Sequence, residues 1–211
     1  MVGNIRNLTR TVVPKISTNA KENISNINSM PEMVLHNLMT NGDKSIVHVG
    51  MNDCAAVKIT PDGVNTVYTD ALNGCNSVGI IAKLKSGNPL AILSHFVPTD
   101  TKGQVKAIEK QLDSYESHID KRYRPKLFFN IRGFNDYGKF EAVPNEIVDN
   151  IKSLISKFFP QGGDTCVTPY PTKGRGAFFS SANIFQFAPQ NLTQLKVTNV
   201  GEEEKFIDLC V

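Results

Sequence analysis

Hydrophobic residues follow two different periods along the chain. Up to residue 96, short runs rich in Val and Ile alternate with polar turn residues, which is typical of β-strands. We expect strands at 46–49, 55–59, 64–72, 78–84 and 90–96. The last two strands are joined by a short turn and therefore predict a β-hairpin.

The second half of the chain changes to a helical period. Apolar residues recur at helical spacing across 103–119 and again across 144–159, which predicts two amphipathic helices. We also expect a short helix at 31–39 and further strands at 127–131, 165–168, 177–187 and 195–200. This order of elements predicts an α/β fold, a layered sandwich with a mixed β-sheet core flanked by helices.

Length and composition predict one folded domain. The chain has 211 residues, of which 40% are hydrophobic, enough for a full core. Residues 1–30 are polar and rich in Asn, Thr and Ser, without the charged-then-apolar start of a secretory signal. We therefore expect a polar arm or leader at 1–45 with one short helix, and a single domain at 46–211.

Charge and cysteine usage exclude several function classes. The net charge is only +3, and Lys and Arg are spread along the chain, so nothing indicates a nucleic-acid partner. No apolar run approaches the roughly 20 residues of a membrane helix. The four cysteines form no C-x-x-C pair and have no metal-ligand spacing with His, so we expect reduced thiols and no metal.

Two reactive side chains fall at neighbouring ends of the predicted hairpin. Cys75 directly precedes one strand, and His95 lies near the end of the other. A thiol needs a base to act as a nucleophile, and imidazole can accept that proton. We therefore expect a Cys75 pKa well below the usual value of about 8.5. The structural alternative is a small buried core cysteine. No patterned partner is evident for His36, His48 or His118.

Four short motifs occur in order between residues 47 and 98. The first is Val-His-Val-Gly-Met at 47–51 with Ala-Ala-Val at 55–57, and the second is Thr69, six positions before Cys75. Leu-Asn-Gly-Cys at 72–75 and Ser-His-Phe-Val-Pro at 94–98 follow. In this combination the chain resembles the Cys-His protein glutamine deamidases, a superfamily that includes the chemotaxis receptor deamidase CheD, the catalytic domain of cytotoxic necrotizing factor and Burkholderia lethal factor.

The resemblance covers roughly residues 46–200 and implies an activity. It implies hydrolysis of a protein glutamine to glutamate and ammonia, without a cofactor. Cys75 would be the nucleophile, His95 the base, and Thr69 the residue that orients the far ring nitrogen of His95. Backbone N–H groups around Cys75 would stabilise the oxyanion, in a substrate cleft formed by Asn73, Gly74 and Asn76.

Two residues depart from the family pattern. Asn73 stands where the toxins have Ser, and Asn76 replaces the Thr or Val that usually follows the cysteine. Both flank the thiol, so these are positions at which substrate fit or oxyanion geometry can differ.

The biological setting has alternatives. The polar leader favours a bacterial effector or toxin, secreted into the host cytosol, acting as a monomer on a glutamine of a host GTPase or other regulatory protein. The alternative within the same chemistry is a CheD-type enzyme in the bacterial cytoplasm. A cysteine protease is a second class, although a Cys-to-His separation of 20 residues is unlike papain-type enzymes. A binding module of the same fold without catalysis is the third.

Overall fold

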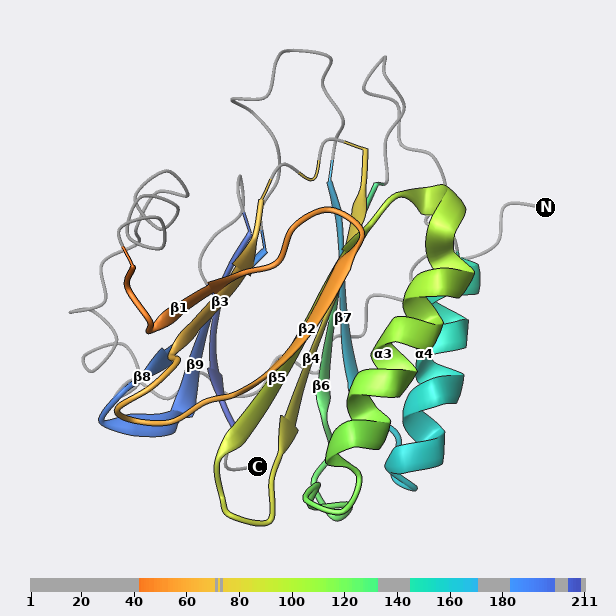
Figure 1. The fold of residues 1–211 in the computed structure, drawn as a ribbon. Helices are drawn as coiled ribbons and strands as arrows, with labels where there is room; N and C mark the ends of the chain where they lie inside the picture. Colours follow the sequence, from red (N-terminus) through yellow and green to blue (C-terminus); the bar gives the residue numbers. More distant parts are fainter. Residues whose placement is uncertain are drawn as a thin grey trace.

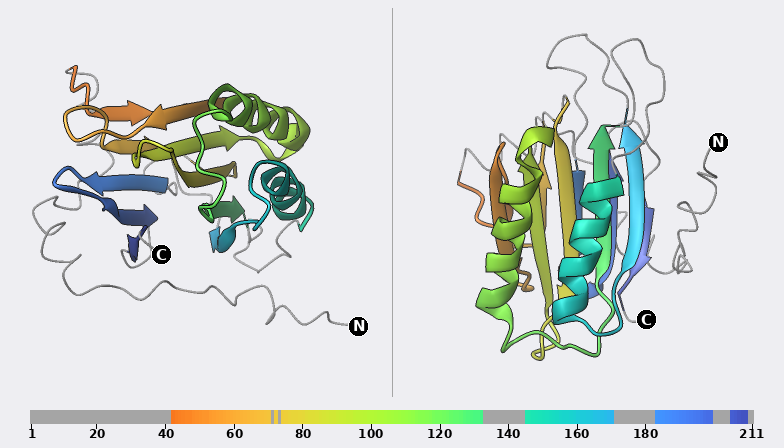
Figure 2. Two further views of the ribbon diagram at one scale, coloured as in Figure 1. Left: turned by 90° about the horizontal axis from the view of Figure 1, so that it is seen from below. Right: turned by 90° about the vertical axis from the view of Figure 1, so that its right-hand side faces the viewer.

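Two β-sheets and a helical layer make up the described part of the protein. The computed structural model describes residues 42–70, 72, 74–132, 145–170, 183–199 and 205–209. Figures 1 and 2 show the two sheets packed face to face, with two helices on the outer face of one of them. The expected α/β sandwich is thus confirmed, although its strands divide into two mixed sheets where the sequence predicted one.

The first sheet has the strand order β1-β3-β8-β9-β10. β1 runs parallel to β3, and the other neighbours are antiparallel. Its strands are β1 (Ile46–His48), β3 (Thr66–Thr69), β8 (Asn183–Ala188), β9 (Asn191–Asn199) and β10 (Lys205–Asp208).

The second sheet has the order β2-β5-β4-β6-β7 and holds the predicted hairpin at its centre. β6 and β7 are parallel, and the other pairs are antiparallel. Its strands are β2 (Asp53–Lys58), β4 (Asn76–Lys83), β5 (Pro89–Phe96), β6 (Lys126–Arg132) and β7 (Asp164–Tyr170). β4 and β5 are therefore covered by strands on both sides.

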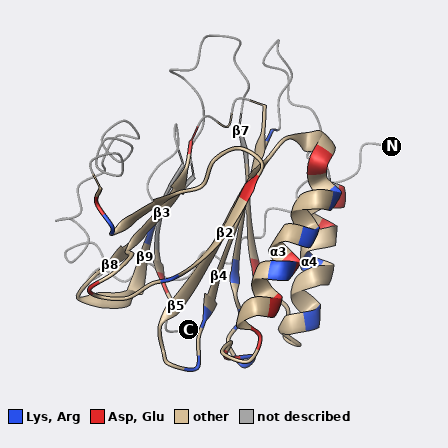
Figure 3. Ribbon diagram, viewed as in Figure 1, with Lys and Arg blue, Asp and Glu red and all other residues tan. Residues whose placement is uncertain are grey.

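The two α-helices of the described residues correspond to the two longer helices that the sequence predicted. A single 3-10 turn, η2 (Pro98–Asp100), leads from β5 into α3 (Thr101–Tyr115), and α4 (Asn145–Phe158) lies beside α3. An ion pair of 2.9 Å between Lys157 Nζ and Glu109 Oε1 joins their exposed sides. Charges of both signs are distributed over these outer helical surfaces (Figure 3). Among the described helices, none is long and apolar enough to cross a bilayer.

The β4–β5 hairpin buries both of its faces, which explains its nearly continuous apolar sequence. Alternate residues contact different layers because strand side chains alternate in direction. Val78 and Ile92 pack beneath the helices, whereas Ile81 and Leu93 pack against the first sheet. At Gly79 the two sheets approach so closely that an added Cβ would collide with the Phe185 ring.

Several sequence expectations need correction or lie outside the described residues. The last strand that the sequence predicted ends at residue 200, but the structure adds β10, which begins at Lys205 and pairs with β9. The four residues of β10 are too few to show a strand pattern in the sequence, and their pairing with β9 forms only in the folded protein. The predicted helix at 31–39 and residues 177–182 of one predicted strand fall outside the described residues, as do His36 and Cys210.

Candidate active site

Strand register brings the two predicted catalytic residues to one end of the sandwich. His95 on β5 lies opposite Ser77 on β4, and Asn76 lies opposite Phe96. Cys75 directly precedes β4, so continuing the register places it beside Val97, two positions from the residue that faces His95. Diagonal neighbours of this kind lie within reach of one another's side chains. Cys75 and Val97 indeed share a small apolar cluster with Leu72.

His95 is held from the opposite sheet by Thr69. The Thr69 Oγ1 and His95 Nδ1 atoms are 2.8 Å apart, and both residues are buried. Thr69 is the last residue of β3 in the first sheet, so this hydrogen bond spans the two sheets. If Nδ1 carries the proton and donates to the hydroxyl oxygen, Nε2 keeps its lone pair and can accept a proton.

The second ring nitrogen of His95 has a different environment. His95 is only 2% exposed, and its Nε2 atom has no hydrogen-bond partner within the part of the chain that the structure describes. Burial lowers the pKa of His95 to about 4, while the Asp70 charge raises this pKa and His48 lowers it. The imidazole is therefore neutral near pH 7, as a general base must be.

Cys75 lies at the end of a tight turn. Gly74 has a φ of 87°, a conformation that favours glycine, and Cys75 N–H donates to the Leu72 carbonyl at 3.1 Å. The thiol is 7% exposed, and burial raises its pKa. The expected lowering of the Cys75 pKa is therefore wrong for this conformation. The cause is that a neutral imidazole offers no positive charge to offset the desolvation of a thiolate.

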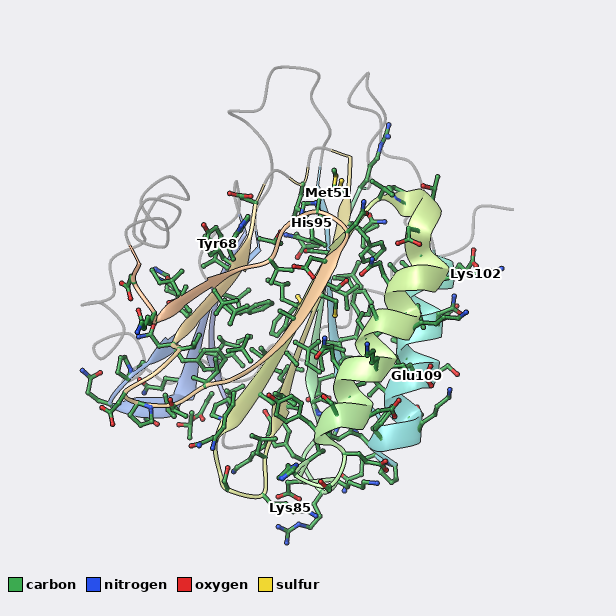
Figure 4. All side chains as sticks on the ribbon, in the orientation of Figure 1. Met51, Tyr68, Lys85, His95, Lys102 and Glu109 are labelled. Carbon is green, nitrogen blue, oxygen red and sulfur yellow. The ribbon has the colours of Figure 1, made fainter. Side chains whose placement is uncertain are left out.

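The Cys75 sulfur contacts a methionine that the sequence analysis did not single out for chemistry. Cys75 Sγ lies 3.8 Å from Met51 Sδ. Met51 precedes β2, and the side chain of the next residue, Asn52, accepts a 3.4 Å hydrogen bond from Val97 N–H. Figure 4 shows Met51 and His95 at the same end of the sandwich.

A second histidine lies next to this group. His48 Nε2 is 3.0 Å from Asp70 Oδ1, and the His48 ring packs on Tyr68 with centroids 4.8 Å apart. The sequence showed no patterned partner for His48, and the structure supplies Asp70, the residue that follows Thr69. Sequence separation hides this pair, because β1 and β3 become neighbours only when the first sheet forms.

The residues predicted for the substrate cleft have three different outcomes. Asn73 lies outside the described residues. Gly74 takes the positive φ that its proposed role allows. The Asn76 side chain accepts a 3.2 Å hydrogen bond from Arg132 N–H and thereby ties the start of β4 to the end of β6. Since Cys75 N–H also has a backbone partner in this conformation, the oxyanion donors stay a prediction.

A polar layer extends from His95 across the second sheet. Ser77 on β4, Asn130 on β6 and Thr168 on β7 stand in one register row with His95, and all are buried. Because register partners share a face, these side chains lie on the side of the sheet that faces the first sheet. The apolar interior of the sandwich therefore ends in a polar row at the candidate site.

The other described cysteines have different surroundings. Cys54, on β2, is opposite Ser94 and packs toward the helices. Burial raises its pKa to about 12, Ser94 lowers this pKa, and the Asp53 charge raises it. Neither Cys54, Cys75 nor Cys166 forms a disulfide. Among the described residues, no group of three His, Cys, Asp or Glu side chains is placed to hold a metal ion.

Comparisons with known proteins find distant structural likeness to solved structures. No family model and no curated protein sequence matches the chain. Among solved structures, the crystal structure of the C-terminal domain of CNFy from Yersinia pseudotuberculosis matches with a TM-score of 0.33 and 9% sequence identity. The match covers 76% of this chain and 59% of that chain. At this TM-score the likeness supports neither a shared activity nor shared site residues.

Proposed function

We propose that the protein is a hydrolase, a protein glutamine deamidase in which Cys75 is the nucleophile and His95 the base. The observation that carries this proposal is the Thr69–His95 hydrogen bond of 2.8 Å between the sheets. It leaves the buried Nε2 of His95 available at the end of the hairpin where Cys75 lies. An oriented neutral imidazole beside a thiol is the arrangement that nucleophilic catalysis by cysteine requires.

The reaction proceeds in two chemical steps. Cys75 Sγ attacks the glutamine carboxamide carbon while His95 Nε2 takes the thiol proton, and the tetrahedral intermediate then expels ammonia, which receives that proton. A thioester remains. His95 next takes a proton from water, the hydroxide displaces the thiol sulfur, and the products are glutamate and the regenerated thiol. Because the resting pair is neutral, proton transfer accompanies attack, and no preformed ion pair is needed.

The glutamine substrate and the biological setting have a separate basis, the motif resemblance. The ordered Thr69, Leu-Asn-Gly-Cys and Ser-His-Phe-Val-Pro motifs support a protein glutamine as the substrate. The polar leader supports a bacterial effector or toxin that reaches a host regulatory protein. A CheD-type role in the bacterial cytoplasm is the competing setting for the same chemistry.

The test is mass spectrometry of candidate target proteins incubated with the full chain. We expect a Gln-to-Glu conversion at one position, ammonia release and an uncut target. The Cys75→Ser variant is the negative control, and Cys54→Ser is the matched control because it removes a thiol on the opposite, helix-facing side of the same sheet. A target cut next to an intact glutamine would instead identify a protease.

A further inference from the structure

The turn between β1 and β2 presents one apolar side chain to solvent beside the candidate nucleophile. Met51 is 62% exposed, and it is the one large hydrophobic residue of the described chain that is exposed. A single exposed apolar residue is ordinary on a protein surface. Its position is not, because its sulfur lies 3.8 Å from Cys75 Sγ.

The backbone that carries Met51 is tied to both sheets. Val49 N–H donates to the Tyr68 carbonyl at 2.8 Å in the first sheet. On the other side, Asp53 lies opposite His95, and Asn52 accepts from Val97 N–H at 3.4 Å. Asn52 itself has a φ of 61°, the left-handed conformation of a tight turn. Met51 is therefore held at the site by its neighbours and is not the tip of a loose loop.

The contact between the two sulfurs places Met51 where a substrate would approach Cys75. The thiol is nearly buried while the thioether is open to solvent, so Met51 covers one side of the approach to Cys75. A substrate that brings its carbonyl carbon to Sγ therefore lies close to the Met51 side chain. A methionine adapts to differently shaped apolar partners because it is unbranched and polarisable.

We propose that Met51 is a specificity-determining residue that binds an apolar side chain next to the reacting glutamine of the target. This inference rests on the proposed function, and it specifies the substrate class further: a glutamine flanked by Leu, Ile, Val, Phe or Met rather than by charged residues. Burying such a side chain against Met51 removes apolar surface of both partners from water, which favours those targets by roughly 10-fold or more.

The first experiment compares peptides that differ only beside the glutamine. One acetylated, amidated peptide carries Leu on each side of Gln, and the other carries Ser. Ammonia release is measured with wild-type protein, Met51→Leu and Met51→Gln. Met51→Gln has nearly the same length but a polar end, so we expect its kcat/KM on the Leu peptide to fall about 10-fold. Met51→Leu should keep the preference. Equal preference in all three proteins overturns the inference.

The second experiment does not depend on deamidation. Cys75 is alkylated with iodoacetamide or with N-benzyl iodoacetamide; in each case a carbon–sulfur bond forms, iodide leaves and the thiol proton passes to the buffer. We expect the apolar reagent to be favoured in the wild type and in Met51→Leu, and this advantage to be lost in Met51→Gln. An unchanged ratio of the two rate constants, or a Cys75 that neither reagent modifies, overturns the inference.

The two experiments separate the inference from the proposed function. Loss of the reagent preference in Met51→Gln, together with no deamidation of any glutamine, would leave Met51 as a recognition residue and remove the deamidase. Deamidation with an unchanged reagent ratio and no peptide preference would keep the deamidase and remove the role of Met51.

Discussion

Ser94 and His95 are consecutive, buried residues of β5, yet the hydrogen bonding of their side chains differs. Ser94 faces the helices, where its hydroxyl donates to Gln104 Oε1 at 2.9 Å, and Gln104 Nε2 donates to Asp100 Oδ2 at 3.1 Å. His95 faces the first sheet, where Thr69 partners Nδ1 and Nε2 has no described partner.

This difference distinguishes a structural network from a candidate site. Buried polar groups are normally hydrogen-bonded, and a satisfied network mainly stabilises one arrangement of the core. A buried imidazole with one nitrogen fixed and the other available is costly for stability but useful for catalysis. The helix face of the hairpin should therefore control stability, and the sheet face should control activity.

The largest expected effect is on activity, and it distinguishes Cys75 from Cys54. Cys75→Ser should reduce deamidation by at least ~1000-fold, because a serine hydroxyl is a far weaker nucleophile with this base. Cys54→Ser, on the helix side, should keep wild-type activity per folded molecule. Initial rates of ammonia release measure both variants. Equal losses in the two variants would contradict the assignment of Cys75.

Thr69 tests whether orientation of His95 matters. Thr69→Val keeps the shape but removes the hydroxyl, so kcat should fall between roughly 10-fold and 1000-fold with little change in KM. Thr69→Ser keeps the hydroxyl and should recover most of the rate. A Thr69→Val variant that is as active as Thr69→Ser would remove Thr69 from the site.

The pH dependence of folding tests the buried state of His95. Its folded pKa of about 4 lies below the ordinary value of 6.5. The unfolded chain therefore binds a proton between these pH values while the folded protein does not, so stability falls as pH decreases from 6.5 toward 4 and is constant above 6.5. This effect amounts to about 2 kcal/mol between pH 7.5 and pH 5.

Urea unfolding at pH 7.5 and pH 5 measures this difference. His95→Gln should remove the contribution of His95, so its free energy of unfolding should decrease less on acidification than that of the wild type. His118→Gln, at an exposed position, is the matched control and should follow the wild type. The same pH dependence in all three proteins would refute the buried neutral imidazole.

The smallest effect concerns the structural face of the hairpin. Ser94→Ala leaves the buried Gln104 carbonyl oxygen without its donor, which should lower the free energy of unfolding by about 1–2 kcal/mol. Activity per folded molecule should stay near the wild-type value, because Ser94 faces away from the site. Chemical denaturation and ammonia release together check this, and loss of activity without loss of stability would break the contrast between the two faces.

Part of this organisation could be predicted because it depends on local pattern. The helical period placed α3 and α4, and the Val- and Ile-rich runs placed the hairpin that carries Cys75 and His95. The order of Thr69, Cys75 and His95 in the motifs led to the prediction that Thr69 contacts His95. The structure places Thr69 Oγ1 2.8 Å from His95 Nδ1. No local signal predicted the division into two sheets, because the sequence of a strand does not specify which other strand it pairs with.

The sequence by itself determined most of the elements, the β4–β5 hairpin and the types of side chain at its ends, because periodicity and turn chemistry act between residues close in the chain. Only the tertiary structure decided that Thr69 reaches His95 from the other sheet, that Asp70 pairs with His48, and that the Met51 sulfur contacts the Cys75 sulfur. It also decided that the Cys75 thiol and the His95 imidazole are each neutral, because pKa values follow burial and neighbouring charge, which exist only once the sheets are packed.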